Sequence, residues 1–169
     1  VSSNLKLKRI TVTFNLNVTN VTLGNLPDVT WVQFGYNNIS NIDISGLPKL
    51  EHFNSISDKL TVLNTSNNPN LKILGLSGNQ IKNLDVSNNL LLENLSVGNN
   101  QLTNLNVHSN TELKILNVTG NQLIALDVSN NAKLINFNTS NNQLSSLKIK
   151  NGNNAILPGT FGPGFGNFP

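Results

Sequence analysis

The sequence predicts a mainly β, right-handed solenoid of about seven 21-residue coils, with two short parallel β-sheets and little or no α-helix. Apolar residues and asparagines both recur every 21 residues, the first set at Leu74, Leu95, Leu116 and Phe137 and the second at Asn79, Asn100, Asn121 and Asn142. A constant period in this range is typical of stacked coils that bury their apolar sides only against each other. Within each unit, alternation such as Leu74-Gly75-Leu76 predicts short strands, and no segment repeats apolar residues at helical spacing.

The first segment, residues 1–17, is predicted to form strands that cap the first coil. Apolar residues alternate with polar ones along it, at Leu5, Leu7, Ile10, Val12, Phe14 and Leu16. Such alternation places every second side chain on one face of a strand. A cap is expected because the end of an open solenoid exposes its core.

The central segment, residues 18–151, is predicted to be the solenoid itself. Its clearest units follow L-x-x-L-x-L-x-x-N-x-L and continue with a second half of similar form, such as Leu84-Asp85-Val86-Ser87. Two strands per unit predict two parallel sheets that face each other across a narrow aliphatic core. Since neighbouring strands lie about 4.8 Å apart, seven units give a rod of roughly 30–35 Å.

The regularly spaced asparagines are predicted to line tight bends. An Asn side chain bonds to neighbouring backbone and tolerates a left-handed backbone conformation. In stacked coils these side chains should form an inward ladder that ties each coil to the next. One unit departs from the pattern, because Asp58 stands where the first Asn is expected.

The last segment, residues 152–169, is rich in Gly, Pro and Phe, and the repeat stops before it. Two interpretations remain open for this tail. It is either a linker to a further domain or an irregular C-terminal cap, in which Phe161, Phe165 and Phe168 fold back over the last coil.

The repeat pattern resembles that of the leucine-rich repeat family, and its nested halves resemble the 21-residue bacterial subclass called IRREKO repeats. Internalins are similar but carry longer repeats. The resemblance implies a non-catalytic recognition protein with a protein partner, located outside a bacterial cell or on its surface. The chain has no Cys, and this favours a bacterial origin, because many eukaryotic extracellular members carry Cys-rich caps.

Composition argues against two classes of partner. Charged residues make up 11% of the chain and the formal net charge is +3. The basic residues are scattered along the chain, with more weight at its two ends, and do not form the continuous stripe of a nucleic-acid binder, so no nucleic acid is expected. No apolar stretch reaches the roughly 20 residues of a membrane span, so no membrane insertion is expected.

The candidate binding residues are outward-facing positions of the first predicted strand in each coil. The set consists of Trp31, Tyr36, His52, Asn54, Ile73 and Ile115. Trp, Tyr and His beside amides suit contact with a protein or stacking against a sugar, and exposed Ile residues add an apolar stripe. The structural alternative is that Trp31 covers the N-terminal cap.

The second predicted face offers no site for a metal, a cofactor or catalysis. Its central positions alternate between Asp and Asn, with Asp43, Asp85 and Asp127 on alternate coils. These carboxylates would lie about 10 Å apart, whereas calcium requires six or more oxygens within about 2.6 Å. We therefore expect them to bond to backbone at bends. A flat solenoid also lacks the water-excluding pocket in which a catalytic triad works.

Three functions remain open at this point. The leading one is recognition of a protein partner through an exposed sheet face. A polysaccharide ligand is the alternative, favoured by the Asn-rich and weakly charged faces. The third is a spacer that holds other domains of a larger surface protein apart.

Overall fold

The computed structural model describes residues 6–149 of the chain. Residues 1–5 and the Gly/Pro/Phe-rich tail lie outside this range, and so do the two interpretations of the tail. The described residues contain eleven strands and no helix, so none of them forms a helix that could cross a membrane. This confirms the predicted mainly β solenoid.

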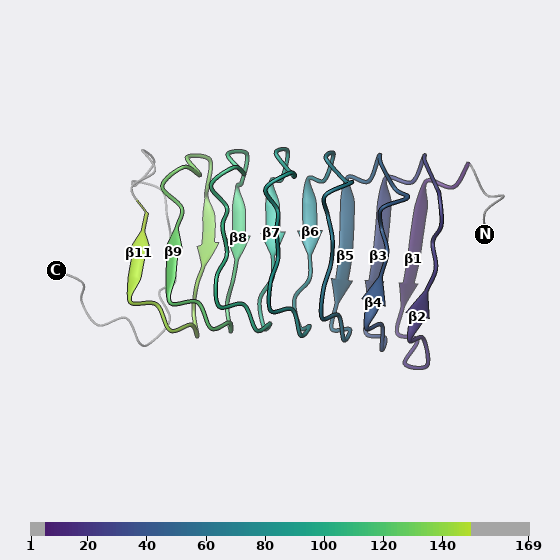
Figure 1. Cartoon of the computed structure of the whole chain (residues 1–169), viewed down its shortest axis with the longest axis horizontal. Coiled ribbons are helices and arrows are strands. Elements are labelled where there is room, and N and C mark those ends of the chain that lie inside the picture. The colour runs from purple at the N-terminus through teal and green to yellow at the C-terminus, as the bar shows by residue number, and fades with distance from the viewer. Residues whose placement is uncertain (1–5, 150–169) are drawn as a thin grey trace.

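Seven strands form one parallel sheet along the whole described rod (Figure 1). In order across the sheet they are β1 (Arg9–Thr13), β3 (Trp31–Gly35), β5 (His52–Ile56), β6 (Ile73–Gly75), β7 (Asn94–Ser96), β8 (Ile115–Asn117) and β10 (Asn136–Asn138). From β3 onward, paired residues are 21 positions apart, as in Trp31 with His52 and His52 with Ile73. Each strand therefore belongs to one turn of the solenoid, as the sequence period predicts.

The opposite side of the coils carries strands only near its two ends. There β2 (Asn20–Val21) pairs with β4 (Asn41–Ile42), and β9 (Ala125–Asp127) pairs with β11 (Ser146–Lys148). The corresponding segments of the middle coils, at residues 62–64, 83–85 and 104–106, form no strand. The predicted second sheet is thus divided into two pieces. On this side, the last backbone hydrogen bond between neighbouring middle coils lies just before these segments, for example from Gln80 N–H to Leu60 O at 2.8 Å.

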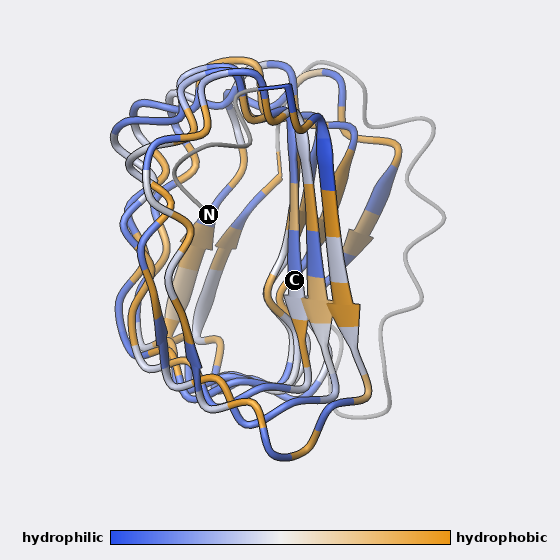
Figure 2. Cartoon of the chain, turned by 90° about the vertical axis from the view of Figure 1, so that its right-hand side faces the viewer, coloured by the Kyte–Doolittle hydropathy of each residue, from blue (hydrophilic) through white to orange (hydrophobic). Residues whose placement is uncertain are grey.

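The core is a single column of apolar side chains between the two sides. Seen end-on, the coils enclose one interior, with strands on opposite sides of it (Figure 2). Leu74 and Leu95 are fully buried, and Leu116 is 1% exposed. In the first coils Phe34 and Phe53 fill the core and meet edge to face, with ring centroids 6.4 Å apart. Burying such side chains contributes about 1.5–3 kcal/mol each.

Two asparagine ladders connect the coils, which confirms and extends the predicted one. In the first ladder, Asn79 Oδ1 accepts the Leu60 N–H, while its Nδ2 donates to the carbonyls of Ser55 and Leu76. Asn100, Asn121 and Asn142 repeat this arrangement. The second ladder consists of Asn68, Asn89, Asn110 and Asn131, all fully buried, whose Nδ2 groups donate to carbonyls of the preceding coil.

Among residues 6–149, five surface ion pairs also join neighbouring coils. In each, an acidic residue pairs with the lysine 21 positions later, at N···O distances of 2.5–3.1 Å. The pairs are Asp28–Lys49, Glu51–Lys72, Glu93–Lys114, Glu112–Lys133 and Asp127–Lys148. Exposed pairs contribute little stability, about 0–1 kcal/mol each.

The N-terminal segment differs in part from its predicted form. Strand β1 joins the first sheet at its edge, but the apolar alternation predicted through Leu16 ends at Thr13. Phe14 and Leu16 are 73% and 67% exposed instead of buried. The reason is the backbone, because Phe14 adopts a left-handed φ of 58° and turns the chain out of the strand.

Candidate functional site

The outward face of the seven-stranded sheet is built by simple alternation along each strand. Inward residues such as Val32, Phe53 and Leu74 are fully buried, so their neighbours along the strand face outward. Parallel pairing aligns these outward residues in rows. The first row contains Arg9, Trp31, His52, Ile73, Asn94, Ile115 and Asn136, and the second contains Thr11, Gln33, Asn54, Gly75, Ser96, Asn117 and Asn138.

A stack of three side chains forms the N-terminal end of the first row. The rings of Trp31 and His52 lie 4.3 Å apart between centroids, at 23° to each other. Arg9 lies over the Trp31 ring with its guanidinium carbon 4.5 Å from the centroid. Since Arg9 and His52 sit on the strands either side of β3, they cover opposite faces of the indole. The stack is thus held by ring packing and a cation–π contact.

Partial burial favours the uncharged form of His52. Partial burial is the main cause that lowers its pKa, and the positive charges of Lys72 and Arg9 lower the pKa further, while Glu51 raises it. Its Nδ1 is buried and has no hydrogen-bond partner among residues 6–149. A neutral imidazole is therefore favoured near neutral pH, which leaves Trp31 with a cation on one face only.

The other predicted residues extend this face unevenly. Ile73 lies beside His52 in the first row, and Ile115 lies two strands further on, both partly buried. Asn54 lies across Gly75, where a Cβ would come within 2.0 Å of Asn54 Oδ1. A side chain at Gly75 would thus displace the Asn54 amide from this face.

Tyr36 does not join the Trp31 group. It follows the last residue of β3, at the opposite end of the strand from Trp31, with a left-handed φ of 57°. Its ring stacks on Phe14, with centroids 4.6 Å apart and planes 3° from parallel. The predicted set therefore divides into a row led by Trp31 and a separate aromatic pair at the bend.

Sequence reasoning missed Arg9 and Phe14 as members of these groups. Phe14 stood in an apparent strand alternation, which concealed that it occupies the bend position of its coil. The signal that identifies it is its spacing, because Phe14 precedes Tyr36 by 22 residues and Tyr36 precedes Ser57 by 21. The same spacing places Arg9 in register with Trp31.

The acidic residues on the second side form bends, as predicted. Oδ1 of Asp43, Asp85 and Asp127 each accepts the backbone N–H two residues later, at 2.8–3.0 Å. Hydrogen bonds from Ser129 and Lys148 lower the pKa of Asp127 to about 2. Within the described part of the chain, no cluster of three or more His, Cys, Asp or Glu is placed to hold a metal ion.

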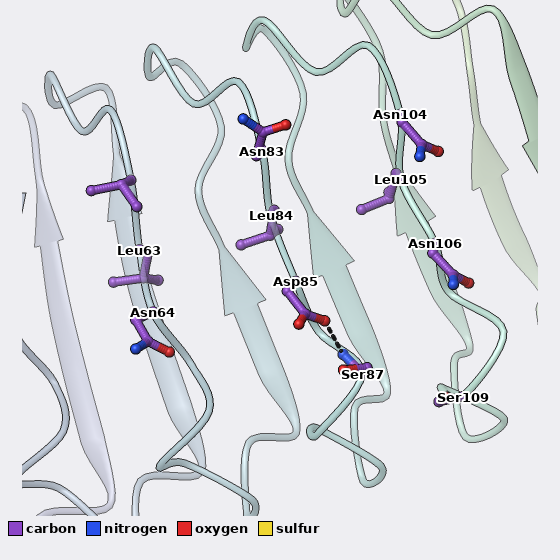
Figure 3. Close-up of a pocket in the computed structure, with 11 residues that line it drawn as sticks. Leu63, Asn64, Asn83, Leu84, Asp85, Ser87, Asn104, Leu105, Asn106 and Ser109 are labelled. Atoms are coloured by element: carbon purple, nitrogen blue, oxygen red, sulfur yellow. Dashed lines mark hydrogen bonds between the residues drawn. The ribbon is translucent and has the colours of Figure 1, made fainter.

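An open groove crosses the middle coils on this second side, where the strands are interrupted. It has a volume of about 460 Å³ and is lined by leucines and amides, including Leu63, Leu84 and Asn104 (Figure 3). A second groove of about 620 Å³ continues it and shares Asn104, Leu105 and Asn106. The figure shows Asp85 bonded to Ser87 at its edge, so this carboxylate is already engaged at the bend.

The repeat and the fold are those of a leucine-rich repeat solenoid, and the chain is similar to solved bacterial proteins of this kind. It is similar to an internalin (inlF) of Listeria monocytogenes, with 27% identity and a TM-score of 0.79, over 91% of this chain and 53% of that one. It is also similar to internalin C2 of the same organism, with 27% identity and a TM-score of 0.70, over 82% of this chain and 64% of that one.

A third likeness supports the fold alone. A leucine-rich repeat protein of Leptospira interrogans shares 19% identity and a TM-score of 0.68, over 88% of this chain and 53% of that one. The chain thus spans about half to two thirds of the length of these proteins. No protein-family profile matches the sequence, and no curated protein matches it.

Proposed function

We propose that the chain is a non-catalytic recognition module, located outside a bacterial cell or on its surface, that binds a protein partner through the outward face of the seven-stranded sheet. The observation that carries the proposal is the composition of the first row. Trp31, His52 and Ile73 form a partly buried, largely apolar centre, and the exposed guanidinium of Arg9 lies over the Trp31 ring. Trp and Arg are the residue types that most often dominate binding energy at protein interfaces.

A charged border flanks this centre on one side. Directly before four of the first-row positions along the chain stand Glu51, Lys72, Glu93 and Lys114, which form two ion pairs at 2.9 and 2.7 Å. An apolar centre with a polar, solvent-exposed border is the usual anatomy of a protein interface. The border also favours a specific partner, because charges at a rim contribute more to selectivity than to affinity.

The rigidity of the face further supports recognition. Each strand is hydrogen-bonded to its neighbours, and the Asn ladders fix the coils from inside. A pre-organised surface loses less conformational entropy when it binds. Catalysis finds no such support, because the two histidines, His52 and His108, lie on opposite sides of the coil.

Binding to intact cells tests the proposal. Fluorescent chain is titrated onto candidate host or neighbouring bacterial cells, before and after surface proteins are removed with protease. We expect saturable binding that protease abolishes and that Ile73→Asp weakens by at least about tenfold, the scale of one interface hot spot. Asn106→Asp, on the opposite side, is the matched control and should bind as wild type. Equal binding by Ile73→Asp would exclude the sheet face.

A polysaccharide ligand is the second candidate, favoured by the amides of the outward rows. Asn94 lies between Ile73 and Ile115, and Asn136 and Asn138 continue the face beyond Ile115. Trp31 itself supports this candidate weakly, because Arg9 and His52 occupy both faces of its ring. In the cell experiment, binding that survives protease but is removed by glycosidases would favour this candidate over a protein partner.

A further inference from the structure

One bend position of every coil has a left-handed backbone. The residues there have φ between 53° and 74°, and they are Phe14, Tyr36, Ser57, Gly78, Asn99, Gly120 and Asn141. Gly and Asn adopt this conformation readily, whereas it is a genuine outlier for a bulky side chain. The first two coils therefore place aromatic residues where the later coils place residues that suit the backbone.

Packing within the fold does not explain this choice. Phe14 is 73% exposed and Tyr36 is 48% exposed. The later coils fill the same position with Ser, Gly or Asn and continue the solenoid without a ring. Strained residues that persist in a rigid structure are concentrated at functional sites, so an outlier of this kind points to a role outside folding.

The backbone holds the two rings in place. Phe14 N–H donates to Gly35 O at 3.0 Å, and Tyr36 N–H donates to Ile56 O at 2.9 Å. Asn37 Oδ1 accepts the N–H of Asn15, directly after Phe14, at 2.9 Å. The rings stack on each other in adjacent coils, 4.6 Å apart and nearly parallel. Together they form a pre-organised aromatic platform that projects into solvent.

The geometry points to a second binding site: we propose that the Phe14–Tyr36 platform binds a neutral polysaccharide by stacking sugar rings against it. This platform differs from the Trp31 ring, whose two faces are covered by Arg9 and His52. Phe14 belongs to the first coil and has Tyr36 on one side, and its large exposed fraction leaves apolar ring surface for a ligand. Aromatic rings pack against flat apolar surfaces, such as the C–H faces of sugars, and the Tyr hydroxyl adds a polar contact.

The two chain segments that carry the rings favour an uncharged ligand. The residues that flank the rings along the chain are Thr13, Asn15, Gly35 and Asn37, none of which carries a charge. Leu16, 67% exposed, extends the apolar surface, and the amide of Asn38 bonds to its carbonyl. Five of the lysines, by contrast, are held in ion pairs elsewhere on the rod.

Affinity electrophoresis of the full chain through gels containing β-glucan, galactomannan, xylan or, for comparison, anionic alginate tests the proposal. We expect at least one neutral polysaccharide to retard the wild type, and Phe14→Asn and Tyr36→Asn to reduce its apparent affinity by about tenfold, the scale of one aromatic contact. Because Asn suits the left-handed backbone, both variants should keep or raise the melting temperature. Tyr36→Phe, which keeps the ring, should still be retarded.

Two controls separate this site from the sheet face. Ser57→Asn changes the same bend position in the next coil and should migrate as wild type. Trp31→Ala alters the proposed protein-binding face and should still be retarded by the polysaccharide. The proposal is overturned if no neutral polysaccharide retards the chain, if Phe14→Asn is retarded like the wild type, or if Trp31→Ala alone abolishes retardation. The protein-recognition proposal is tested independently, by the weaker cell binding expected of Ile73→Asp.

Discussion

The hydroxyl of Ser55 donates a hydrogen bond of 2.6 Å to Oδ2 of Asp58, at the position of the first ladder where an aspartate replaces asparagine. An ordinary member of this ladder donates from its amide to the carbonyl three residues earlier, as Asn79 does to Leu76. A carboxylate has no proton to donate. Ser55, in the position that Leu76 occupies one coil later, instead supplies a donor to the carboxylate. Two departures from the repeat therefore compensate each other.

This compensation predicts coupling between the two sites. Ser55→Ala leaves a buried carboxylate oxygen without its donor and should lower the free energy of unfolding by about 1–3 kcal/mol. In an Asp58→Asn background the same change should cost less, because the amide bonds to backbone on its own. Urea unfolding of the two single variants and the double variant measures the coupling. Equal costs in both backgrounds would contradict the compensation.

The second ladder contains a matched pair of positions with and without a hydroxyl donor. Thr65 Oγ1 donates to Asn89 Oδ1 at 2.7 Å. One coil later Val86 replaces the threonine, and Asn110 Oδ1 is buried without a hydrogen-bond partner in the described part of the chain. Val86→Thr should raise the free energy of unfolding by about 0.5–1.5 kcal/mol, and Thr65→Val should lower it by about 1–3 kcal/mol. Chemical denaturation checks both, and a destabilising Val86→Thr would show that the acceptor is out of reach.

The alternation of inward and outward residues predicts opposite responses at two adjacent positions. Leu95 is fully buried and Ser96 faces outward on the same strand, β7. Leu95→Asp places an unpaired carboxylate in the core, at a cost of several kcal/mol that approaches the total stability of a domain. Circular dichroism should show an unfolded chain for Leu95→Asp and a folded one for Ser96→Asp. A folded Leu95→Asp would contradict the observed register.

The pKa of His52 predicts how stability depends on pH. Burial lowers this pKa below the usual 6.5, so the unfolded chain binds a proton at a pH where the folded chain does not. Stability should therefore be complete above pH 6.5 and decrease as the pH falls from 6.5 through the folded pKa. The pKa values of Asp43, Asp85 and Asp127 are lowered from 3.8, so their contributions are lost only below that value.

Melting curves between pH 7 and pH 5 measure this dependence. His52→Gln should flatten the decrease. The chain contains one Trp, so the fluorescence of Trp31 reports directly on its stacked neighbour. An unchanged pH dependence in His52→Gln would show that another group titrates in this range.

The sequence predicted the repeating part of the structure well, because that part depends on spacing alone. The positions of Leu74 and Leu95 in the core and of Asn79 in a ladder follow from one period and one alternation. The interrupted second sheet could not be predicted in this way. Whether segments such as 83–85 pair depends on the distance between coils, which residue types do not encode.

The candidate site shows the same division. The neighbourhood of Trp31 and His52 follows from the period, since they are 21 residues apart. The separation of Tyr36 from that group depends on a left-handed bend after Gly35, which no apolar pattern reveals. The same spacing relates Glu51 to Lys72, so the 21-residue period also contains the signal for the ion pairs.

We expect the inter-coil ion pairs also to distinguish one repeat from the next during folding. Neighbouring units have very similar Leu and Asn positions. During folding, a coil could therefore stack on the next-but-one coil instead of on the adjacent coil. Depending on its position, such a slip would bring Glu51 beside Glu93 or Lys72 beside Lys114, because acid and base alternate along this column. Repulsion between like charges then penalises the misaligned stack, while the correct one gains two attractive contacts. Weak surface ion pairs can thus favour the correct order of the coils over a misaligned one.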